Sequence, residues 1–247
     1  MTLPPGYRHR RFAEIGSTNQ AAAEAGQAGE PELLVITAGV QTAGRGRRGR
    51  DWVSPVGNLY SSVLLRPDVS PAVGAQLSFV AALAVSDLVA EAIPGAPVVA
   101  CKWPNDVLVN GAKIAGILLE SQTDAAGHLA WLVIGAGINV VSHPPNTAYA
   151  ATSLAACGAS VAAEDCLALY LARLDHWRQV WMGQGFAPVR AAWLARAWRL
   201  GEVITARLGE KSLGGIFEGL DDAGALLLAG HDGRRHVIAA GEVFAPA

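Results

Sequence analysis

Several residue classes are scarce in this chain of 247 residues, and each scarcity excludes a class of protein. Three cysteines, Cys101, Cys157 and Cys166, suit neither a metal site nor a disulfide framework, so we expect a reducing compartment, the cytoplasm. Charged residues make up only 16% of the chain and the net charge is −2, which argues against a general nucleic-acid binder. No run of 18 uncharged apolar residues and no N-terminal run of signal length occur, so we expect no membrane partner.

Two common nucleotide-binding motifs are also missing. The sequence contains no Gly-Lys-Ser/Thr run, which excludes a Walker-type phosphate loop. Gly135 and Gly137 begin a glycine-rich pattern, but Val140 stands where a dinucleotide fingerprint needs its third glycine. The six histidines do not group, so the sequence predicts no protein-bound metal centre.

The chain has ample apolar residues for a core, since 51% of it is hydrophobic. Several predicted strands follow one another without helices between them, which indicates a mixed, largely antiparallel sheet with helices on one face. The expected fold is therefore a two-layer α+β fold. Helices are predicted at 17–26, 71–93, 164–185 and 188–198, and strands at 33–40, 58–67, 98–103, 106–110, 113–121 and 129–141.

The character of the sequence changes after Arg199. Short β runs split by glycine and aspartate fill the last 48 residues or so, which is typical of a small closed β-barrel. We therefore expect two domains, at 1–198 and 199–247.

Residues 44–50, GRGRRGR, pack three glycines and four arginines into one loop. Arginine forks onto phosphate or carboxylate, and the glycines allow backbone N–H groups to turn towards an anion. A solvated loop or an RGG-type nucleic-acid segment has the same composition. The loop is internal, short and flanked by predicted strands, which favours a discrete anionic ligand.

A second polar stretch is CKWPNDVLVNGAKIAGILLE, where Trp103 to Asp106 form a break between two strands and Lys113 opens the next strand. Each residue alone has an ordinary explanation. A lysine at a sheet edge is usually solvated, and Asp106 and Asn139 are common turn formers.

Taken together, four motifs resemble those of biotin–protein ligases: STNQ at 17–20, QTAGRGRRGRDWVSP at 41–55, KWPNDVLVNGAKIAGILLE at 102–120 and GAGIN at 135–139. The glycine-rich β runs after residue 199 resemble the C-terminal β-barrel of that family, which is similar to Src-homology-3 domains. The resemblance implies a fold like that of class II aminoacyl-tRNA synthetases. It also implies a catalytic domain at 1–198.

The resemblance implies an activity too: formation of biotinyl-5′-adenylate from biotin and ATP with Mg²⁺, then transfer of biotin to a lysine of a carrier protein. The catalytic residues it implies are Lys113, Arg45 and Asp106, with Asp106 as a general base. The implied biotin site is Ser17, Thr18, Asn19, Gln41, Gly44, Arg45, Gly46, Arg47, Lys113 and Gly116. The implied ATP and adenylate site is Arg47, Arg50, Trp52, Asn105, Lys113 and Asn139.

The partner implied by the resemblance is a biotin carboxyl carrier protein or domain, with a homodimer left open. About sixteen residues precede the STNQ motif, too few for the helix-turn-helix domain of bifunctional relatives, so we expect no operator DNA. Two alternatives remain. One is a lipoate or octanoate ligase or transferase of the same fold, and the other is a nucleic-acid-binding protein whose arginine loop grips phosphates.

Overall fold

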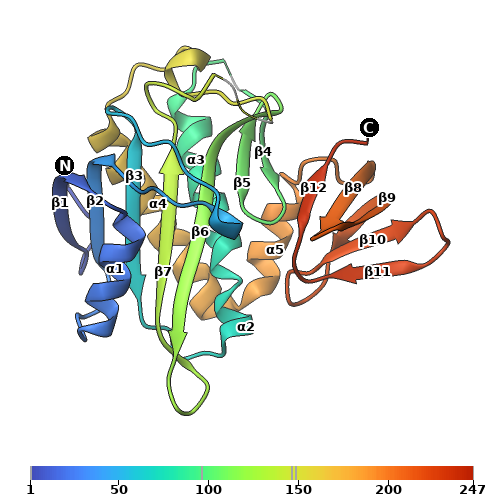
Figure 1. The fold of residues 1–247 in the computed structure, drawn as a ribbon, viewed down its shortest axis with the longest axis horizontal. Coiled ribbons are helices and arrows are strands. Elements are labelled where there is room, and N and C mark those ends of the chain that lie inside the picture. Colours follow the sequence, from blue (N-terminus) through green and yellow to red (C-terminus); the bar gives the residue numbers. More distant parts are fainter. Residues whose placement is uncertain (1, 96, 146, 148, 247) are drawn as a thin grey trace.

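The computed structural model describes residues 2–95, 97–145, 147 and 149–246. A seven-stranded sheet forms the centre and a five-stranded sheet lies beside it at the C-terminal end (Figure 1). The central sheet has the order β1-β2-β3-β7-β6-β5-β4. Its strands are β1 Arg8–Ile15, β2 Leu34–Gln41, β3 Leu59–Leu65, β4 Val99–Lys102, β5 Asp106–Val109, β6 Ala112–Thr123 and β7 Leu129–Ile138. β1 pairs with β2 in parallel and the other neighbours pair antiparallel, as predicted.

The strands predicted at 106–110 and 113–121 are joined by a hairpin, for which the Asn110-Gly111 pair is a strong sequence signal. Asn110 and Gly111 both have positive φ values, 49° and 82°, which a two-residue turn of this kind requires. The hairpin places Asp106 and Lys113 on adjacent strands, where Asp106 is paired with Gly116 and Lys113 with Leu108.

The first strand was not foreseen from the sequence. β1 carries three arginines, and most of its side chains are exposed. Because it is an edge strand, backbone pairing with β2 holds it without the alternation of apolar residues that reveals an inner strand.

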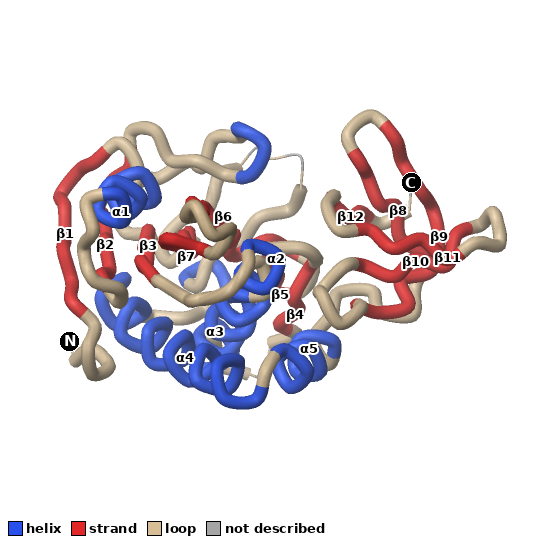
Figure 2. The backbone as a smooth tube through the Cα atoms, turned by 90° about the horizontal axis from the view of Figure 1, so that it is seen from below, coloured by secondary structure: helices blue, strands red, loops and turns tan. Residues whose placement is uncertain are grey.

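Helices lie on both faces of the central sheet (Figure 2). α3 Leu77–Ala92 and α4 Ala163–Gln184 cover one face, as expected, with α2 Pro71–Gly74 and α5 Phe186–Leu194 at their ends. α1 Thr18–Gln27 packs on the opposite face, where Ala22 and Ala25 contact Ile36 and Trp131. Its small side chains let it lie close against the strands, a placement that a helix-on-one-face pattern does not anticipate.

The most apolar helical stretch is buried. Pro71–Ala92, through α2 and α3, is long and apolar enough to cross a membrane, but 72% of its most apolar window lies inside the fold. Leu77, Val80, Leu83 and Leu88 are fully buried between the sheet and α4. The composition of this segment is therefore accounted for by its place in the core.

The C-terminal strands form an antiparallel sheet of order β11-β10-β9-β8-β12, matching the small all-β unit expected from the sequence. The strands are β8 Val203–Leu208, β9 Lys211–Leu220, β10 Leu226–Gly230, β11 Arg235–Ile238 and β12 Glu242–Phe244. Residues 234–244 contain two strands, because β12 pairs with β8 at the edge opposite β11. The segment 239–241 between them leads β12 back towards the central sheet (Figure 1).

The two sheets share one continuous apolar core. Phe217, Leu226 and Val243 belong to the same buried cluster as α3 and the central strands. Trp103 Nε1 donates to the Gly224 carbonyl oxygen at 3.1 Å across the boundary. The C-terminal sheet is thereby held in a fixed position beside the ends of β4 and β5.

Candidate functional site

One cavity of about 460 Å³ collects the predicted motifs. It lies where the ends of β5, β6 and β7 meet the arginine loop, the N-terminus of α1 and strand β12. Segments far apart in the sequence thus line a single space. The predicted site residues that line it are Ser17, Thr18, Asn19, Gln41, Arg45, Gly46, Arg47, Arg50, Trp52, Asn105, Asp106, Lys113, Gly116 and Asn139.

The arginine loop is a tight irregular hairpin. The backbones of Arg45 and Asp51 form an isolated antiparallel β-bridge, and Gly46 N donates to the Arg50 carbonyl at 2.7 Å. A short 3-10 turn occupies Arg47–Gly49. Gly44 does not line the cavity. A Cβ there would lie 2.4 Å from the Trp52 carbonyl oxygen, so this position needs glycine to close the hairpin.

The loop arginines are held from three directions. Arg45 lies 3.6 Å from Glu120 of β6, and Arg50 forms an ion pair with Glu242 of β12. Arg47 Nη1 donates to Asn105 Oδ1 at 3.2 Å and to the Gly241 carbonyl at 3.3 Å. Burial lowers the pKa of the Arg47 guanidinium from its usual value, which reflects a cation poorly exposed to water.

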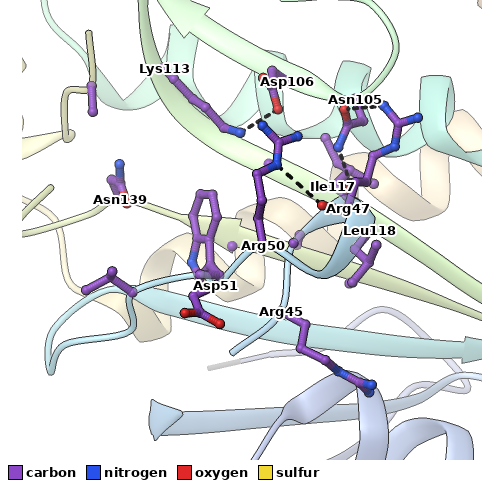
Figure 3. Close-up of a pocket in the computed structure, with 18 of the residues that line it drawn as sticks. Arg45, Arg47, Arg50, Asp51, Asn105, Asp106, Lys113, Ile117, Leu118 and Asn139 are labelled. Carbon is purple, nitrogen blue, oxygen red and sulfur yellow. Dashed lines mark hydrogen bonds and ion pairs between the residues drawn. The ribbon is translucent and has the colours of Figure 1, made fainter. Parts of the chain in front are cut away.

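Lys113 and Asp106 form a short ion pair inside the cavity. Lys113 Nζ lies 2.6 Å from Asp106 Oδ1 (Figure 3). The same Nζ lies 5.3 Å from the centre of the Trp52 ring. Both side chains are largely buried. In such a site a fixed ammonium interacts with a developing negative charge more strongly than it would in water.

Trp52 packs against two glycines that are paired across β6 and β7. Gly116 and Gly137 are paired in register, and a Cβ at Gly137 would lie 2.5 Å from Trp52 Cε2. A Cβ at Gly116 would lie 3.1 Å from the same ring. The two glycines therefore make room for the Trp52 ring, and this role accounts for Gly137 in the GAGIN motif.

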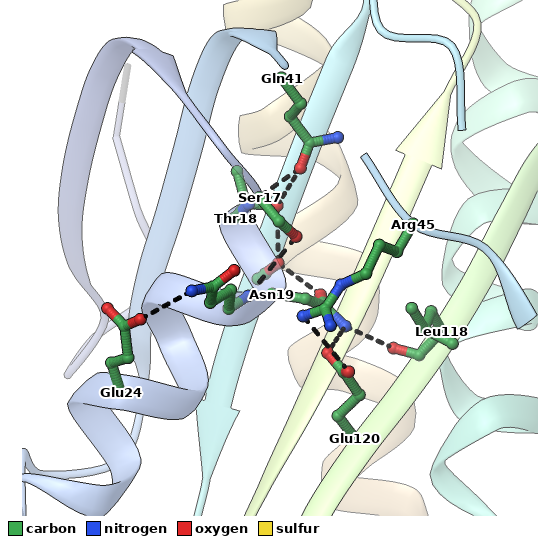
Figure 4. Close-up of polar contacts among 10 residues, drawn as sticks. Ser17, Thr18, Asn19, Glu24, Gln41, Arg45, Leu118 and Glu120 are labelled. Atoms are coloured by element: carbon green, nitrogen blue, oxygen red, sulfur yellow. Dashed lines mark hydrogen bonds and ion pairs between the residues drawn. The ribbon is translucent and has the colours of Figure 1, made fainter. Parts of the chain in front are cut away.

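The start of α1 forms a polar network beside the arginine loop (Figure 4). Ser17 caps the helix, and Gln41 Oε1 accepts hydrogen bonds from Thr18 N at 2.8 Å and from Thr18 Oγ1 at 3.0 Å. Asn19 Nδ2 donates to Glu120 Oε2 at 2.9 Å. Gln41 Nε2 donates a hydrogen bond to Ser54 Oγ at 3.0 Å.

Asn19 also depends on a glycine of the sheet. A Cβ at Gly135 would lie 2.0 Å from Asn19 Oδ1, and Ser62 Oγ donates to that same oxygen at 2.6 Å. Ser61, next to it, is fully buried, lines the cavity and has a hydroxyl without a partner among the described residues. This end of the cavity therefore presents amide and hydroxyl groups suited to a neutral polar ligand group.

Two predicted asparagines hold backbone segments of the cavity wall. Asn105 Nδ2 donates to the Ile117 carbonyl at 2.6 Å, which joins the KWPND segment to β6. Asn139 Nδ2 donates to the Thr152 carbonyl at 2.9 Å and fastens the 150–152 segment over Lys113.

Sequence reasoning missed several residues of this site. Glu120 and Lys102 are the last and first residues of the motif at 102–120, so the sequence could have indicated both. Tyr149, Glu242 and Phe244 carried no signal, because only folding brings β12 and the 149 segment to the cavity. Within the described part of the chain, no group of three His, Cys, Asp or Glu side chains is placed to hold a metal ion.

Comparison with known proteins draws these features together. Residues 12–139 match the biotin/lipoate A/B protein ligase family, and residues 200–245 match the biotin protein ligase C-terminal domain. The chain belongs to the biotin protein ligase family. It is therefore an enzyme, and the cavity contains the motifs by which this family was recognised in the sequence.

Individual relatives support the family assignment. A biotin–[acetyl-CoA-carboxylase] ligase of Paracoccus denitrificans is 47% identical over 215 residues, which cover 85% of this chain and 89% of that protein. The enzyme of the same name from Mycobacterium tuberculosis is 35% identical over 236 residues, covering 94% and 86%. Among solved structures, the Aquifex aeolicus biotin protein ligase in complex with biotin and ATP aligns with a TM-score of 0.81 and 28% identity, covering 96% and 97% of the two chains.

Proposed function

We propose that this biotin protein ligase forms biotinyl-5′-adenylate from biotin and ATP, releases pyrophosphate, and transfers biotin to a specific lysine of a biotin carboxyl carrier protein. One observation carries the proposal. A single cavity joins a neutral polar end at α1 to a cationic end made by the arginine loop and Lys113. Such a cavity suits a ligand with a ureido ring at one end and a carboxylate that must meet a triphosphate at the other.

In the first step a biotin carboxylate oxygen attacks the α-phosphorus of ATP, and the bond to the β-phosphate oxygen breaks. Both reactants are anions, so fixed cations must offset their repulsion. Arg45, Arg47 and Lys113 bind the carboxylate and the α-phosphate, and Arg50 binds phosphate. Ser17, Thr18, Asn19 and Gln41 bind the ureido end, and Gly46 and Gly116 allow the backbone to approach. Gly44 contributes indirectly, by closing the hairpin of the loop.

The nucleotide lies towards Trp52, Asn105 and Asn139. The Trp52 ring offers an apolar face next to adenine or ribose. Mg²⁺ enters with ATP, and because no carboxylate cage stands ready among the described residues, phosphate oxygens and water supply most of its ligands.

In the second step the ε-amine of the carrier lysine attacks the carbonyl carbon of the mixed anhydride, and AMP leaves. A free lysine has a pKa of about 10.4, so its amine must lose a proton first. Asp106 is the carboxylate we assign to this task, because it lies beside Lys113 at the reacting end of the cavity. Because the proposed reaction uses ATP and a carboxylase carrier, we propose that the enzyme is cytoplasmic and needs neither DNA nor a membrane. The open edge of β1 would permit a homodimer.

The test is pyrophosphate release by the purified protein with ATP and biotin, with ATP and lipoate, and with ATP alone. A lipoate arm is needed because the matched family includes lipoate ligases. The expected result is pyrophosphate release only in the arm with ATP and biotin, followed by ATP-dependent labelling of a carrier domain. Release only in the arm with ATP and lipoate would overturn the assignment of the substrate, and release in neither arm would overturn the adenylation itself.

A further inference from the structure

Lys102 is a lysine of the cavity that has no role in the chemistry above. The chain has only three lysines, Lys102, Lys113 and Lys211, against sixteen arginines, and two of the three line this cavity. Lys102 ends β4 and is paired in register with Asp106 of β5. Its position therefore puts a second ammonium close to the Lys113–Asp106 pair.

The ammonium of Lys102 is enclosed by aromatic rings. Its Nζ lies 4.8 Å from the ring centre of Tyr149, 5.3 Å from that of Phe244 and 5.5 Å from that of Trp198. Tyr149 directly precedes the 150–152 segment that is hydrogen-bonded to Lys113, Phe244 ends β12, and Trp198 lies between α5 and β8. Tyr149 and Phe244 also contact each other, with centroids 5.5 Å apart.

The charge of Lys102 is left without an anion. Lys113, Arg45 and Arg50 each have a carboxylate partner, whereas among the described residues Lys102 Nζ has neither an ion pair nor a hydrogen bond. Burial lowers the pKa of the Lys102 ammonium, and nearby Lys113 lowers it further while Asp106 and Glu242 oppose them. Aromatic faces hold a cation without neutralising it, so an incoming anion would meet an ammonium that no carboxylate contacts directly.

We propose that Lys102 binds the β- and γ-phosphates of ATP and the pyrophosphate that leaves. This inference rests on the proposed adenylation. When the bond from the α-phosphorus breaks, the electron pair goes to the leaving pyrophosphate oxygen, and an ammonium beside it stabilises the added charge. Phe244 is a positioning residue, through which β12 of the C-terminal sheet contributes to phosphate binding.

The experiment compares Lys102→Met and Lys102→Arg with Lys211→Met, which removes an exposed lysine at the start of β9. Three quantities are measured in each: the KM for ATP in biotin-dependent pyrophosphate release, inhibition by added pyrophosphate, and transfer from supplied biotinyl-5′-adenylate to a carrier domain. Lys102→Met should raise the KM for ATP and the inhibition constant for pyrophosphate by about 10- to 100-fold each, the range of one hydrogen bond to a charged group. Transfer from supplied adenylate, which involves no pyrophosphate, should stay within about twofold of wild type, and Lys211→Met should match wild type throughout.

Several outcomes would overturn the proposal. Equal losses in adenylation and transfer would mean that Lys102 only supports the cavity, and so would equal impairment of Lys102→Met and Lys102→Arg. Phe244→Leu should raise the KM for ATP but not the KM for biotin, while Phe244→Tyr keeps the ring and should preserve both. If the wild type releases no pyrophosphate with biotin, the proposed function fails; calorimetric binding of inorganic pyrophosphate to wild type and Lys102→Met still tests Lys102 separately.

Discussion

The ammonium of Lys113 and the carboxylate of Asp106 lie 2.6 Å apart on neighbouring strands of one hairpin. In the free protein each therefore neutralises the other. In the proposed mechanism, a substrate carboxylate or phosphate that binds Lys113 competes with Asp106, and this competition frees an Asp106 oxygen for the incoming carrier lysine. The pair would then link the two proposed half-reactions.

Substituting each member of this pair should separate the half-reactions. Lys113→Ala should raise the barrier to adenylate formation by about 2–4 kcal/mol, or about 30- to 800-fold in rate, because a fixed charge at the reacting phosphate is lost. Asp106→Asn should slow transfer from supplied adenylate more than it slows pyrophosphate release. Single-turnover assays of each step measure this. Identical effects of Asp106→Asn on both steps would remove Asp106 from the role of base.

Arg47→Gly should release the adenylate early, because Arg47 is a half-buried cation of the loop that we assign to the phosphate, held in place by Asn105 and the Gly241 carbonyl. Free adenylate acylates exposed amines, so labelling should spread from the carrier to bystander proteins and to Lys211 of the enzyme itself. Mass spectrometry of biotinylated peptides measures the spread.

The matched control is Arg48→Gly. Arg48 is the next residue, does not line the cavity and has a φ of 57°, which glycine adopts without strain. It should retain the adenylate like wild type. If both variants leak equally, loop flexibility rather than the Arg47 side chain governs retention.

Gly137→Ala should displace Trp52 from the sheet, since the added Cβ would lie 2.5 Å from its ring. The KM for ATP should rise more than the KM for biotin, because the ring borders the nucleotide end of the proposed site. Steady-state kinetics with each substrate varied in turn will show the split. Gly183→Ala in α4, where nothing lies within 4 Å of the new Cβ, should instead stabilise the protein by about 0.5–1 kcal/mol without changing either KM.

Alkaline pH should destabilise the fold through buried thiols. Burial raises the pKa of Cys101 to about 12 and that of Cys166 to about 11. In the unfolded chain a cysteine loses its proton near pH 8.5, so the stability contributed by these neutral thiols is complete below about pH 8 and falls as the pH rises towards their folded pKa values. Urea titrations from pH 7 to 11 measure the fall.

Two alanine substitutions test its origin. Cys101→Ala should make the decline with pH shallower, because one buried thiol no longer titrates on unfolding. Cys157→Ala, at a partly exposed position, is the comparison and should keep the slope of wild type more closely. Equal slopes for Cys101→Ala and wild type would show that other groups, such as the buried tyrosines, cause the alkaline loss.

The sequence by itself determined the local elements and the composition of the site. Apolar periodicity located α1, α3 and α4, Asn110-Gly111 located a hairpin, and Ser17 located a helix start, because each depends on contacts between near neighbours. Residue type and resemblance alone predict an anion-binding role for the arginine loop and Lys113.

Only the tertiary structure decided which groups meet. β1 is held by backbone pairing at a sheet edge, and α1 lies on the second face, both of which depend on distant strands. Glu242 reaches Arg50, and Phe244 reaches Lys102, because β12 returns beside β8 at the edge near the cavity. Contacts between residues more than 140 positions apart leave no periodicity in the chain, since they arise from the packing of whole sheets on a shared core.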